Sequence, residues 1–483
     1  MISNLRPYPA YKDSGVEWLG QVPAHWEVRR LGSVTQILNG ATPSSSRPEY
    51  WDGDIVWVTP DDLGKLKGRY IDNSSRRITR EGYNACGTTL APVGSIVVST
   101  RAPIGHLGIL RVAACANQGC RLLVPQAPTA SEYLYYALVA ARPSLEVFGQ
   151  GSTFLELSRS KLRAFPVPFP PLPEQTAIVR FLDYKDRRIR RSIRGKQKLV
   201  KLLEEYKQAL IHQAVTGRID VRTGKPYPAY KSSGVEWLGE VPEHWELKPL
   251  KRWVRLNASV LPDTTPADYE FRYIDIGMVG TGFLTREPQR LRFGNAPSRA
   301  RRVLHMGDTI ISTVRTYLKA VYYVDGDAED LVCSTGFAVL TPGPSTQPKY
   351  VSYLVQSNTF TDHVTAESVG TAYPAIAEGR LGSFHVPIPP LPEQTAIVEY
   401  LDAQTAKIDA AIAAARREIE LLREYRERLI ADVVTGKVDV REVSERLPEE
   451  PEEPELLQEE AEPLSDESEE TIEALSADEE SED

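Results

Sequence analysis

The chain has 483 residues, of which 41% are apolar and 25% are charged, which is enough for two or three domains with cores of their own. Residues 442–483 hold 20 acidic residues and one basic residue, so the formal net charge of −9 conceals a net charge of +10 over residues 1–441. No run of about 18 apolar residues predicts a membrane span, the N-terminus lacks a signal-peptide pattern, and the four cysteines lack metal-ligand spacing.

These features predict a cytoplasmic protein with reduced thiols. A basic body is typical of proteins that bind nucleic acid, although +10 over 441 residues is only suggestive. The C-terminal tail is rich in Glu, Ser and Pro and is predicted to be disordered. It either increases solubility or competes with DNA for the basic body.

The N-terminal segment is repeated later in the chain. Residues 7–31 and 226–250 are identical at 19 of 25 positions, at an offset of 219. Each copy contains a His-Trp pair, His25-Trp26 and His244-Trp245, that could suggest a site. Neither copy has a nucleophile or an acid in a recognisable arrangement, so we interpret the segment as a folded loop whose tryptophans anchor each unit.

Two divergent globular segments follow, at about 27–169 and 246–388. Both contain short runs rich in Val and Ile and bounded by Gly, Pro or Asp, which predict strands. The predicted strands are Ile55–Thr59, Gly94–Thr100, Leu107–Val112, Cys120–Val124, Tyr273–Ile276, Gly307–Thr313, Ala320–Val324 and Phe337–Thr341. With helices at Ser131–Ala141 and Tyr350–Thr359, each segment is predicted to be an α+β domain, mainly β, built on a curved antiparallel sheet.

A long helix is predicted after each globular segment. PPLPEQTAIVRFLD (170–183) recurs as PPLPEQTAIVEYLD (389–402), and the helices are predicted to end at Gly217 and Gly436. Each helix would hold about 43 residues and span roughly 65 Å.

The apolar positions of both helices form a narrow stripe of near-heptad period, which favours one partner helix over a broad core. The other copy is the nearest partner, so we predict that the two helices form an antiparallel coiled coil. The predicted helix-pairing residues are Ile178, Leu182, Ile189, Leu203, Ile397, Leu401, Ile408 and Leu422, with Leu199 and Tyr206 on the same stripe.

The predicted organisation is therefore a tandem duplication with approximate two-fold symmetry. Its segments are an N-terminal motif with the first globular domain (1–169), a first long helix (170–217), the repeated motif with the second globular domain (218–388), a second long helix (389–436) and a strand-like end with the acidic tail (437–483).

Catalytic motifs are hard to assemble from this sequence. The glycines of residues 273–282 faintly resemble a nucleotide-binding loop, but no clear helix follows them and the first copy lacks them. Pro60-Asp61 has no convincing nuclease partner, and neither Ser99 nor Ser312 can be placed beside a base. We predict no catalytic and no metal-binding residue.

Arg, Lys, Asn, Gln and Tyr side chains on the loops are the candidate DNA contacts, because such side chains neutralise phosphates or pair with base edges. Arg101 and Arg315 stand out because each follows a matching strand end. For any one position, a solvated surface charge is the competing interpretation. The candidates are Arg76, Arg77, Arg101, Asn117, Gln118, Arg299, Arg301, Arg302, Arg315, Tyr317 and Lys319.

The duplicated G-V-E-W-L-G and H-W-E segment, the duplicated P-L-P-E-Q leading into a long helix, and the divergent segments between them resemble specificity subunits of type I restriction–modification systems. The resemblance covers residues 1–441, and the acidic tail is not part of the family pattern.

The resemblance implies a DNA-binding subunit without catalysis. Each recognition domain, at about 30–165 and 249–384, would read one half of a bipartite, asymmetric DNA target. The paired helices, through the helix-pairing residues named above, would dock two methyltransferase subunits that modify adenine N6, and motor/nuclease subunits would join for restriction. The chain itself would bind no cofactor, and S-adenosylmethionine, ATP and Mg²⁺ would belong to the partners. A self-contained DNA methyltransferase or nuclease, a coiled-coil adaptor and a specificity subunit of a related multi-subunit restriction system are the alternatives.

Overall fold

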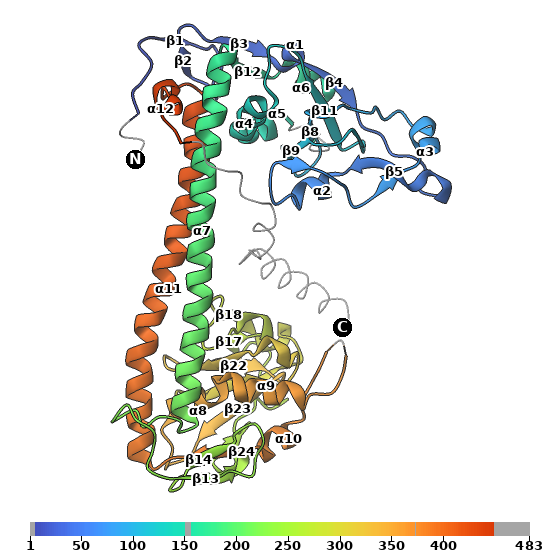
Figure 1. Cartoon of the computed structure of the whole chain (residues 1–483). Coiled ribbons are helices and arrows are strands. Elements are labelled where there is room, and N and C mark those ends of the chain that lie inside the picture. Colours follow the sequence, from blue (N-terminus) through green and yellow to red (C-terminus); the bar gives the residue numbers. More distant parts are fainter. Residues whose placement is uncertain (1–4, 150–155, 372, 449–483) are drawn as a thin grey trace. The chain divides into compact units, whose positions relative to one another are not determined.

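The computed structural model describes residues 5–149, 156–371 and 373–448 (Figure 1). The predicted disorder of the acidic tail concerns residues that lie outside these ranges from 449 on. The chain divides into two compact units. Of the described residues, unit 1 contains those up to Lys196 and those from Arg417 on, and unit 2 contains Gln197–Arg416. Each of the two long helices, α7 (Leu172–Val215) and α11 (Leu391–Val434), therefore contributes one part to each unit.

The globular domain of unit 1 contains two main sheets. The five-stranded sheet has the order β4 (Thr35–Asn39), β11 (Cys120–Pro125), β8 (Ile96–Ser99), β9 (Leu107–Leu110) and β6 (Tyr70–Ile71). The three-stranded sheet has the order β10 (Ala114–Ala116), β5 (Trp51–Val58) and β7 (Arg77–Ile78). Two short pairs join the domain to its motif, β1 (Tyr11–Asp13) with β2 (Gln21–Pro23) and β3 (Glu27–Arg30) with β12 (Pro166–Phe169).

Unit 2 repeats this plan with changes at the sheet edges. One sheet has the order β16 (Val254–Leu256), β23 (Phe337–Pro342), β20 (Thr309–Ser312) and β21 (Val321–Tyr323). The other has the order β18 (Gln289–Arg292), β17 (Glu270–Ile274), β22 (Leu331–Ser334) and β19 (Ala300–Val303). The short pairs are β13 (Tyr230–Ser232) with β14 (Glu240–Pro242) and β15 (Glu246–Pro249) with β24 (His385–Ile388).

Short helices complete both units. Unit 1 has α1 (Leu31–Val34), η2 (Pro48–Tyr50), α2 (Pro60–Gly64), α3 (Arg80–Ala85), α4 (Ser131–Ala140), α5 (Arg142–Gly149), α6 (Arg159–Ala164) and α12 (Arg441–Glu445). Unit 2 has η3 (Leu250–Arg252), η4 (Ile276–Met278), η5 (Phe293–Asn295), η6 (Thr316–Leu318), α8 (Pro348–Gln356), α9 (Asn358–Ala366) and α10 (Glu378–Ser383).

The eight predicted strands and both predicted short helices are confirmed, but the expectation of one antiparallel sheet is wrong. Each domain divides its strands between two main sheets, and β5 pairs with β10 in parallel, as β17 does with β22. β6 and β9 are also parallel. Runs of Val and Ile identify strands, but they do not determine the direction of the neighbouring strand, which depends on contacts distant in sequence.

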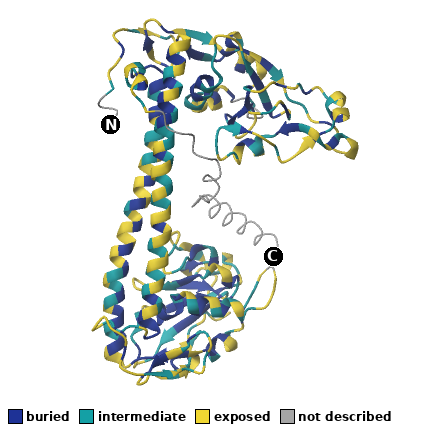
Figure 2. Cartoon of the chain, in the orientation of Figure 1, coloured by how far each residue is buried: buried dark blue, intermediate teal, exposed yellow. Residues whose placement is uncertain are grey.

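Burial follows the strand and helix pattern within each unit, as Figure 2 shows. In unit 1 the strands β8, β9 and β10 are buried at every position. In unit 2 the same holds for β20 and β22. Near-continuous apolar strands of this kind need cover on both faces.

In each unit the two long helices lie side by side and antiparallel. In unit 1, Ile178, Leu182 and Ile189 share an apolar cluster with the α11 residues Leu429 and Ile430, with Leu422 packed against it. The ion pairs Asp186–Arg426 and Lys196–Glu418 show that numbers rise along α7 as they fall along α11.

In unit 2, Leu203 packs against Ile408, while Ile397 and Leu401 share the core cluster with Ile211. The ion pairs Lys207–Asp409 (2.7 Å) and Glu204–Arg416 (2.9 Å) give the same antiparallel direction.

Two residues placed on the predicted stripe do not take part in helix pairing. Leu199 and Tyr206 are 46% and 56% exposed, because their part of α7 presents a different set of positions to α11. The predicted helix ends are confirmed. Gly217 (φ 71°) and Gly436 (φ 75°) follow the two helices in the left-handed conformation. A Cβ at either glycine would lie 2.4 or 2.3 Å from Cδ of Pro242 or Pro23, so both also permit a close approach of the repeated motif.

Among the described residues, no helix combines the length and the apolar character that a membrane span requires.

Candidate nucleic-acid interface

The repeated motif docks on the first turn of each long helix through one buried glutamate. Pro173 and Pro392 begin the helices, so the glutamate that follows lies at the positive end of a helix dipole. Glu174 accepts hydrogen bonds from Tyr8 Oη (3.2 Å) and Trp26 Nε1 (2.8 Å), and its Oε1 lies 2.6 Å from His25 Nε2. Arg441 lies 3.5 Å from the same carboxylate. We call this group the first junction cluster.

The second junction cluster has the same composition in unit 2. Glu393 accepts from Tyr227 Oη (3.1 Å) and Trp245 Nε1 (3.0 Å), and it contacts His244 (2.9 Å) and Arg222 (3.4 Å). Burial alone would raise the pKa of Glu393, but the hydrogen bonds from Trp245, His244 and Tyr227 outweigh it and lower the pKa below 4.5. The His-Trp pairs are therefore structural partners of a carboxylate. This agrees with the interpretation of the repeated segment as a folded loop whose tryptophans anchor each unit.

Away from the junction, both recognition domains share one backbone arrangement at the end of a central strand. In unit 1, Thr100 follows β8 and bonds Gly119 O through its amide (2.7 Å) and its hydroxyl (3.2 Å), while Leu157 N donates to Thr100 O (2.8 Å). In unit 2, Thr313 follows β20 and bonds Gly336 O (2.8 and 2.9 Å), while Ile376 N donates to Thr313 O (2.8 Å). We call this arrangement the strand-end frame.

The loops on the strand-end frame of unit 1 carry polar and basic side chains. Asn117 Oδ1 accepts from Gly119 N (2.9 Å) and shapes the turn, and the exposed Gln118 accepts a hydrogen bond from Thr42. Arg121 donates to Gln118 O (2.9 Å). Arg101 lies 3.5 Å from Glu156, and its side chain is 49% exposed. We call Thr42, Arg101, Asn117, Gln118 and Arg121 the polar loop cluster.

One glycine allows the loops of the polar loop cluster to meet. A Cβ at Gly40 would lie 1.9 Å from Asn117 O, which no side chain could tolerate without moving the turn. Amide and guanidinium groups held by backbone contacts can pair with base edges or phosphates. The exposed ion pair Arg101–Glu156 contributes little free energy in water, so Arg101 can leave Glu156 for another partner with little loss of stability.

The loops on the strand-end frame of unit 2 have different chemistry. Arg315 is 7% exposed, and its guanidinium lies 4.7 Å from the ring centroid of Tyr373. Lys319 Nζ lies 2.7 Å from Asp362, and Tyr317 is exposed between the two basic residues. Arg315 and Lys319 both adopt the left-handed conformation (φ 49°), which costs roughly 1–2 kcal/mol per non-glycine residue.

The remaining predicted DNA contacts lie elsewhere on the domains. Arg76 stacks 3.7 Å above the Trp51 ring, and Arg77 Nε bonds Asn73 (3.0 Å). Arg299 lies 3.3 Å from Asp275, and Arg301 lies 4.5 Å from the Phe293 ring.

Arg302 has an internal structural role. It is 8% exposed, and it bonds Asn257 (2.8 Å), Glu378 and the backbone of Phe337. The predicted DNA contacts of Arg302 and of the other candidates stay predictions. Sequence reasoning missed Phe283, Leu318 and Val369, which are exposed near the second frame. Exposed apolar residues on a strand-rich segment look like core residues in the sequence alone.

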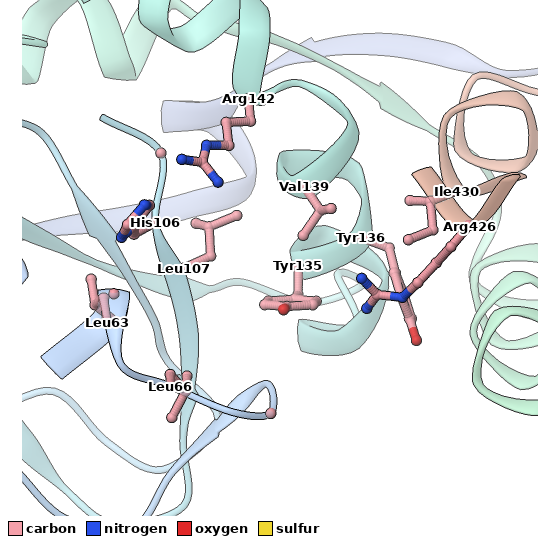
Figure 3. Close-up of a pocket in the computed structure, with 13 residues that line it drawn as sticks. Leu63, Leu66, His106, Leu107, Tyr135, Tyr136, Val139, Arg142, Arg426 and Ile430 are labelled. Atoms are coloured by element: carbon pink, nitrogen blue, oxygen red, sulfur yellow. The ribbon is translucent and has the colours of Figure 1, made fainter. Parts of the chain in front are cut away.

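A cavity of about 260 Å³ lies in unit 1 between the α2–β6 loop, β9, α4 and α11 (Figure 3). Its polar lining includes His106, Arg142 and Arg426. Burial, followed by the charge of Arg142, lowers the pKa of His106, and its Nδ1 has no hydrogen-bond partner. Arg142 is paired with Glu146 (3.3 Å), and Arg426 with Asp186. The lining thus lacks the paired acid and base or the nucleophile that an active site needs.

Within the part of the chain that the structure describes, no three His, Cys, Asp or Glu residues could hold a metal ion. Burial raises the pKa of the Cys115 and Cys120 thiols to about 12, so neither forms a reactive thiolate. Fold and loops together define a duplicated binding protein of two α+β domains and two long helices.

Comparison with known proteins identifies the family. Residues 23–201 and 294–421, more than half of the chain, match the family described as "Type I restriction modification DNA specificity domain". The chain belongs to this family of type I restriction–modification specificity subunits, whose members are non-catalytic recognition components.

Two relatives illustrate the extent of the similarity. The MjaIX specificity subunit of Methanocaldococcus jannaschii is 33% identical over 234 residues, which are 48% of this chain and 52% of the relative. The match therefore spans about half the length of that relative. The MjaVIII specificity subunit of the same organism is 22% identical over 443 residues, 88% of this chain and 95% of the relative.

A solved structure supports the fold. A chain from "Structural basis underlying complex assembly and conformational transition of the type I R-M system" superposes with a TM-score of 0.64 at 17% identity. The alignment covers 86% of this chain and 99% of the solved one.

Proposed function

We propose that this chain is the DNA sequence-recognition subunit of a type I restriction–modification complex and reads a bipartite, asymmetric target. Each recognition domain binds one half-site. One observation carries the proposal: the two units repeat the junction cluster and the strand-end frame, while the loops on that frame differ in chemistry. Equivalent frames present equivalent loops to a ligand, and unlike loops bind unlike sequences.

The loops have the side chains that this role requires. Arg101 and Gln118 in unit 1, and Lys319 in unit 2, can contact phosphates or base edges. The sequence outside the acidic tail has a net charge of +10, which favours DNA association. The long helix pair sets the spacing of the two half-sites.

The partners in this proposal are two methyltransferase subunits that modify adenine N6, joined by motor/nuclease subunits, in the cytoplasm. S-adenosylmethionine, ATP and Mg²⁺ belong to those partners. The predicted docking residues Ile178, Leu182, Ile397 and Leu401 are buried inside the units, so they act through helix pairing.

Exposed apolar residues on the helices are better docking contacts. Leu202 and Tyr206 lie one turn apart on α7 in unit 2, and both are about half exposed. At the repeat offset, α11 in unit 1 has Leu421, which is exposed, and Tyr425, which is half-buried. A repeated apolar pair matches two copies of the same partner.

Mapping methylated adenines in a host with and without this chain, in the presence of its methyltransferase subunit, tests the proposal. We expect a split motif that is methylated only when the chain is present. Methylation of the same motif without the chain would contradict it, and binding of S-adenosylmethionine by the isolated chain would favour a self-contained methyltransferase.

A further inference from the structure

Five large apolar side chains are exposed together on three loops of unit 2. Phe283, Tyr317, Leu318, Val369 and Tyr373 have exposed fractions between 39% and 82%. Hydrogen bonds join their loops: Thr281 Oγ1 donates to Lys319 O (2.9 Å), and the hydroxyls of Thr316 and Ser368 lie 2.8 Å apart. We call these five residues the apolar loop patch. Large apolar side chains exposed on neighbouring loops of a domain mark an interaction site.

The loops of the patch are held in a strained, defined conformation. Arg315 and Lys319 bracket η6 and both have φ of 49°. Contacts of Arg315 with Tyr373 and of Lys319 with Asp362 hold the two turns. Backbone strain that the surroundings maintain is typical of functional sites, and a preorganised loop loses less entropy on binding.

The patch lies on loops of the same strand-end frame that carries the polar loop cluster in unit 1. Val314 and Ala375 form a β-bridge beside Thr313, as Arg101 and Glu156 do beside Thr100. Among the described residues of unit 1, the loops at 41–44, 59–68, 100–106 and 117–121 expose no large apolar side chain. The two domains therefore present unlike surfaces on the same frame.

The surroundings indicate which partner covers the patch. Residues 279–303, which include Phe283, contain six arginines and one glutamate, a charge that suits phosphates. A protein partner that binds both units alike needs a surface that repeats, as the Leu202–Tyr206 and Leu421–Tyr425 pairs do. The described loops of unit 1 at 41–44, 59–68, 100–106 and 117–121 carry no matching patch, which favours the one ligand that differs between the two domains, the DNA half-site.

We propose that the apolar loop patch reads its half-site through apolar contacts with base edges, chiefly thymine methyl groups, and that Tyr317 and Phe283 are specificity-determining residues. This inference rests on the proposed function. Thymine presents its C5 methyl group in the major groove, where aromatic side chains can pack against it. Unit 1, with Gln118, Asn117 and Arg101, reads its half-site through hydrogen bonds instead.

The test uses the complex assembled with its methyltransferase subunits and a target identified from methylated adenines. Thymines of the half-site read by unit 2 are replaced one at a time by uracil, which pairs identically but lacks the methyl group. We expect the wild-type complex to lose about fourfold in affinity for each contacted methyl group. Tyr317→Ala and Phe283→Ala should weaken binding to the thymine target and abolish the difference between thymine and uracil.

Matched controls separate this contact from general effects. Met306 is 75% exposed in the turn that precedes β20, whereas the patch follows the strand, so Met306→Ala should leave both affinities unchanged. Replacement of thymine by uracil in the half-site read by unit 1 should change the DNA affinity of the wild type and of Tyr317→Ala by the same factor. The salt dependence of binding should stay the same in Tyr317→Ala, because no phosphate contact is lost.

Three results would overturn the inference: no uracil effect anywhere in the half-site of unit 2, an equal uracil effect in the wild type and the patch variants, or variants that lose methyltransferase association while DNA affinity is retained. The last result would assign the patch to a protein partner. Failure of the proposed function looks different, because the wild-type complex would then bind its mapped target no better than unrelated DNA.

Discussion

The junction clusters and the loop clusters differ in how closely unit 2 repeats unit 1. At the junctions, Glu174 and Glu393 bind Tyr, Trp and His partners at the repeat offset of 219, and each binds one Arg partner, with nearly the same distances. Unit 1 has polar side chains on the loops of its strand-end frame, whereas unit 2 has an apolar, aromatic surface on the loops of its own frame. Regions that hold the fold are thus duplicated faithfully, and regions that can meet a ligand are not.

The junction glutamates provide the largest expected effect. Glu393→Ala would leave Trp245 Nε1 and Tyr227 Oη buried without an acceptor, at a cost of about 3–5 kcal/mol in the free energy of unfolding. Glu174→Ala should cost about the same in unit 1. Urea unfolding followed by tryptophan fluorescence measures both, because Trp26 and Trp245 lie in the clusters.

The exposed Glu399 on α11 is the control, and Glu399→Ala should change stability by less than about 0.5 kcal/mol. A cost below about 1 kcal/mol for Glu393→Ala, or clearly unequal costs for the two junction variants, would show that the clusters are not equivalent structural supports.

The contacts between the two long helices differ between the units, and substitutions there should have a smaller effect on the free energy of unfolding. In unit 1, Asp186 is mostly buried, with its side chain 16% exposed, between Arg190 (2.7 Å) and Arg426, whereas in unit 2 Lys207, which matches Arg426 at the repeat offset, pairs with the more exposed Asp409. Arg426→Ala should lower the free energy of unfolding by about 2 kcal/mol, since Arg190 still balances part of the buried charge.

Lys207→Ala is the matched variant in unit 2 and should cost about 0.5 kcal/mol, because its partner is half exposed. Thermal unfolding of both variants gives the comparison. Equal losses would mean that the buried ion pair contributes no more than a surface pair.

Acidic pH should modestly lower the stability of the helix contacts around Asp186 and of the second junction cluster around Glu393. Burial raises the pKa of Asp186, but the charges of Arg190 and Arg426 outweigh burial and bring the pKa below 3.8, and the pKa of Glu393 is below 4.5. Lowered folded-state pKa values contribute stability above the unfolded-state values, and this stability is lost as the pH falls through the folded-state values. The melting temperature should therefore fall below about pH 4.5, and less steeply in Glu393→Gln. A melting temperature that rises on acidification would contradict this assignment.

The smallest expected effect concerns the acidic tail, whose predicted competition with DNA stays a prediction. Deleting residues 449–483 removes 18 acidic residues and leaves the contacts of Arg441 and Leu447 in place. If the tail competes for the basic surface, DNA affinity should rise a few-fold at low salt and stay unchanged at high salt, where screening removes the competition. Equal affinity at both salt concentrations would favour a role in solubility.

Much of the fold could be predicted because the sequence is duplicated, so that each long helix and strand pattern occurs at two places in the chain. The offset of 219 residues located both long helices, and Gly217 and Gly436 located their ends. The sheet partners could not be predicted, because the parallel pairing of β5 with β10 depends on contacts distant in sequence. The strand ends after Thr100 and Thr313 were found from the repeat, which is why Arg101 and Arg315 stood out.

Side-chain environment was the missing information at the candidate site. Arg302 and Arg299 look alike in the sequence, but the first is buried against Glu378 and the second is partly exposed beside Asp275. Phe283 and Val369 have the composition of core residues, and only the structure places them on the surface. The residue type alone does not show whether a basic or apolar side chain contacts the interior of the protein or lies on its surface.

The central claim is that the two recognition domains share the strand-end frame but bind different half-sites independently of each other. Exchange of one recognition domain tests this claim most directly. Residues 249–384 are replaced by those of a relative, and methylated adenines are mapped in cells that contain the methyltransferase subunit. We predict that one half-site of the motif changes, while the other half-site and the spacer between them stay the same. A change in both half-sites, or in neither, would contradict the account.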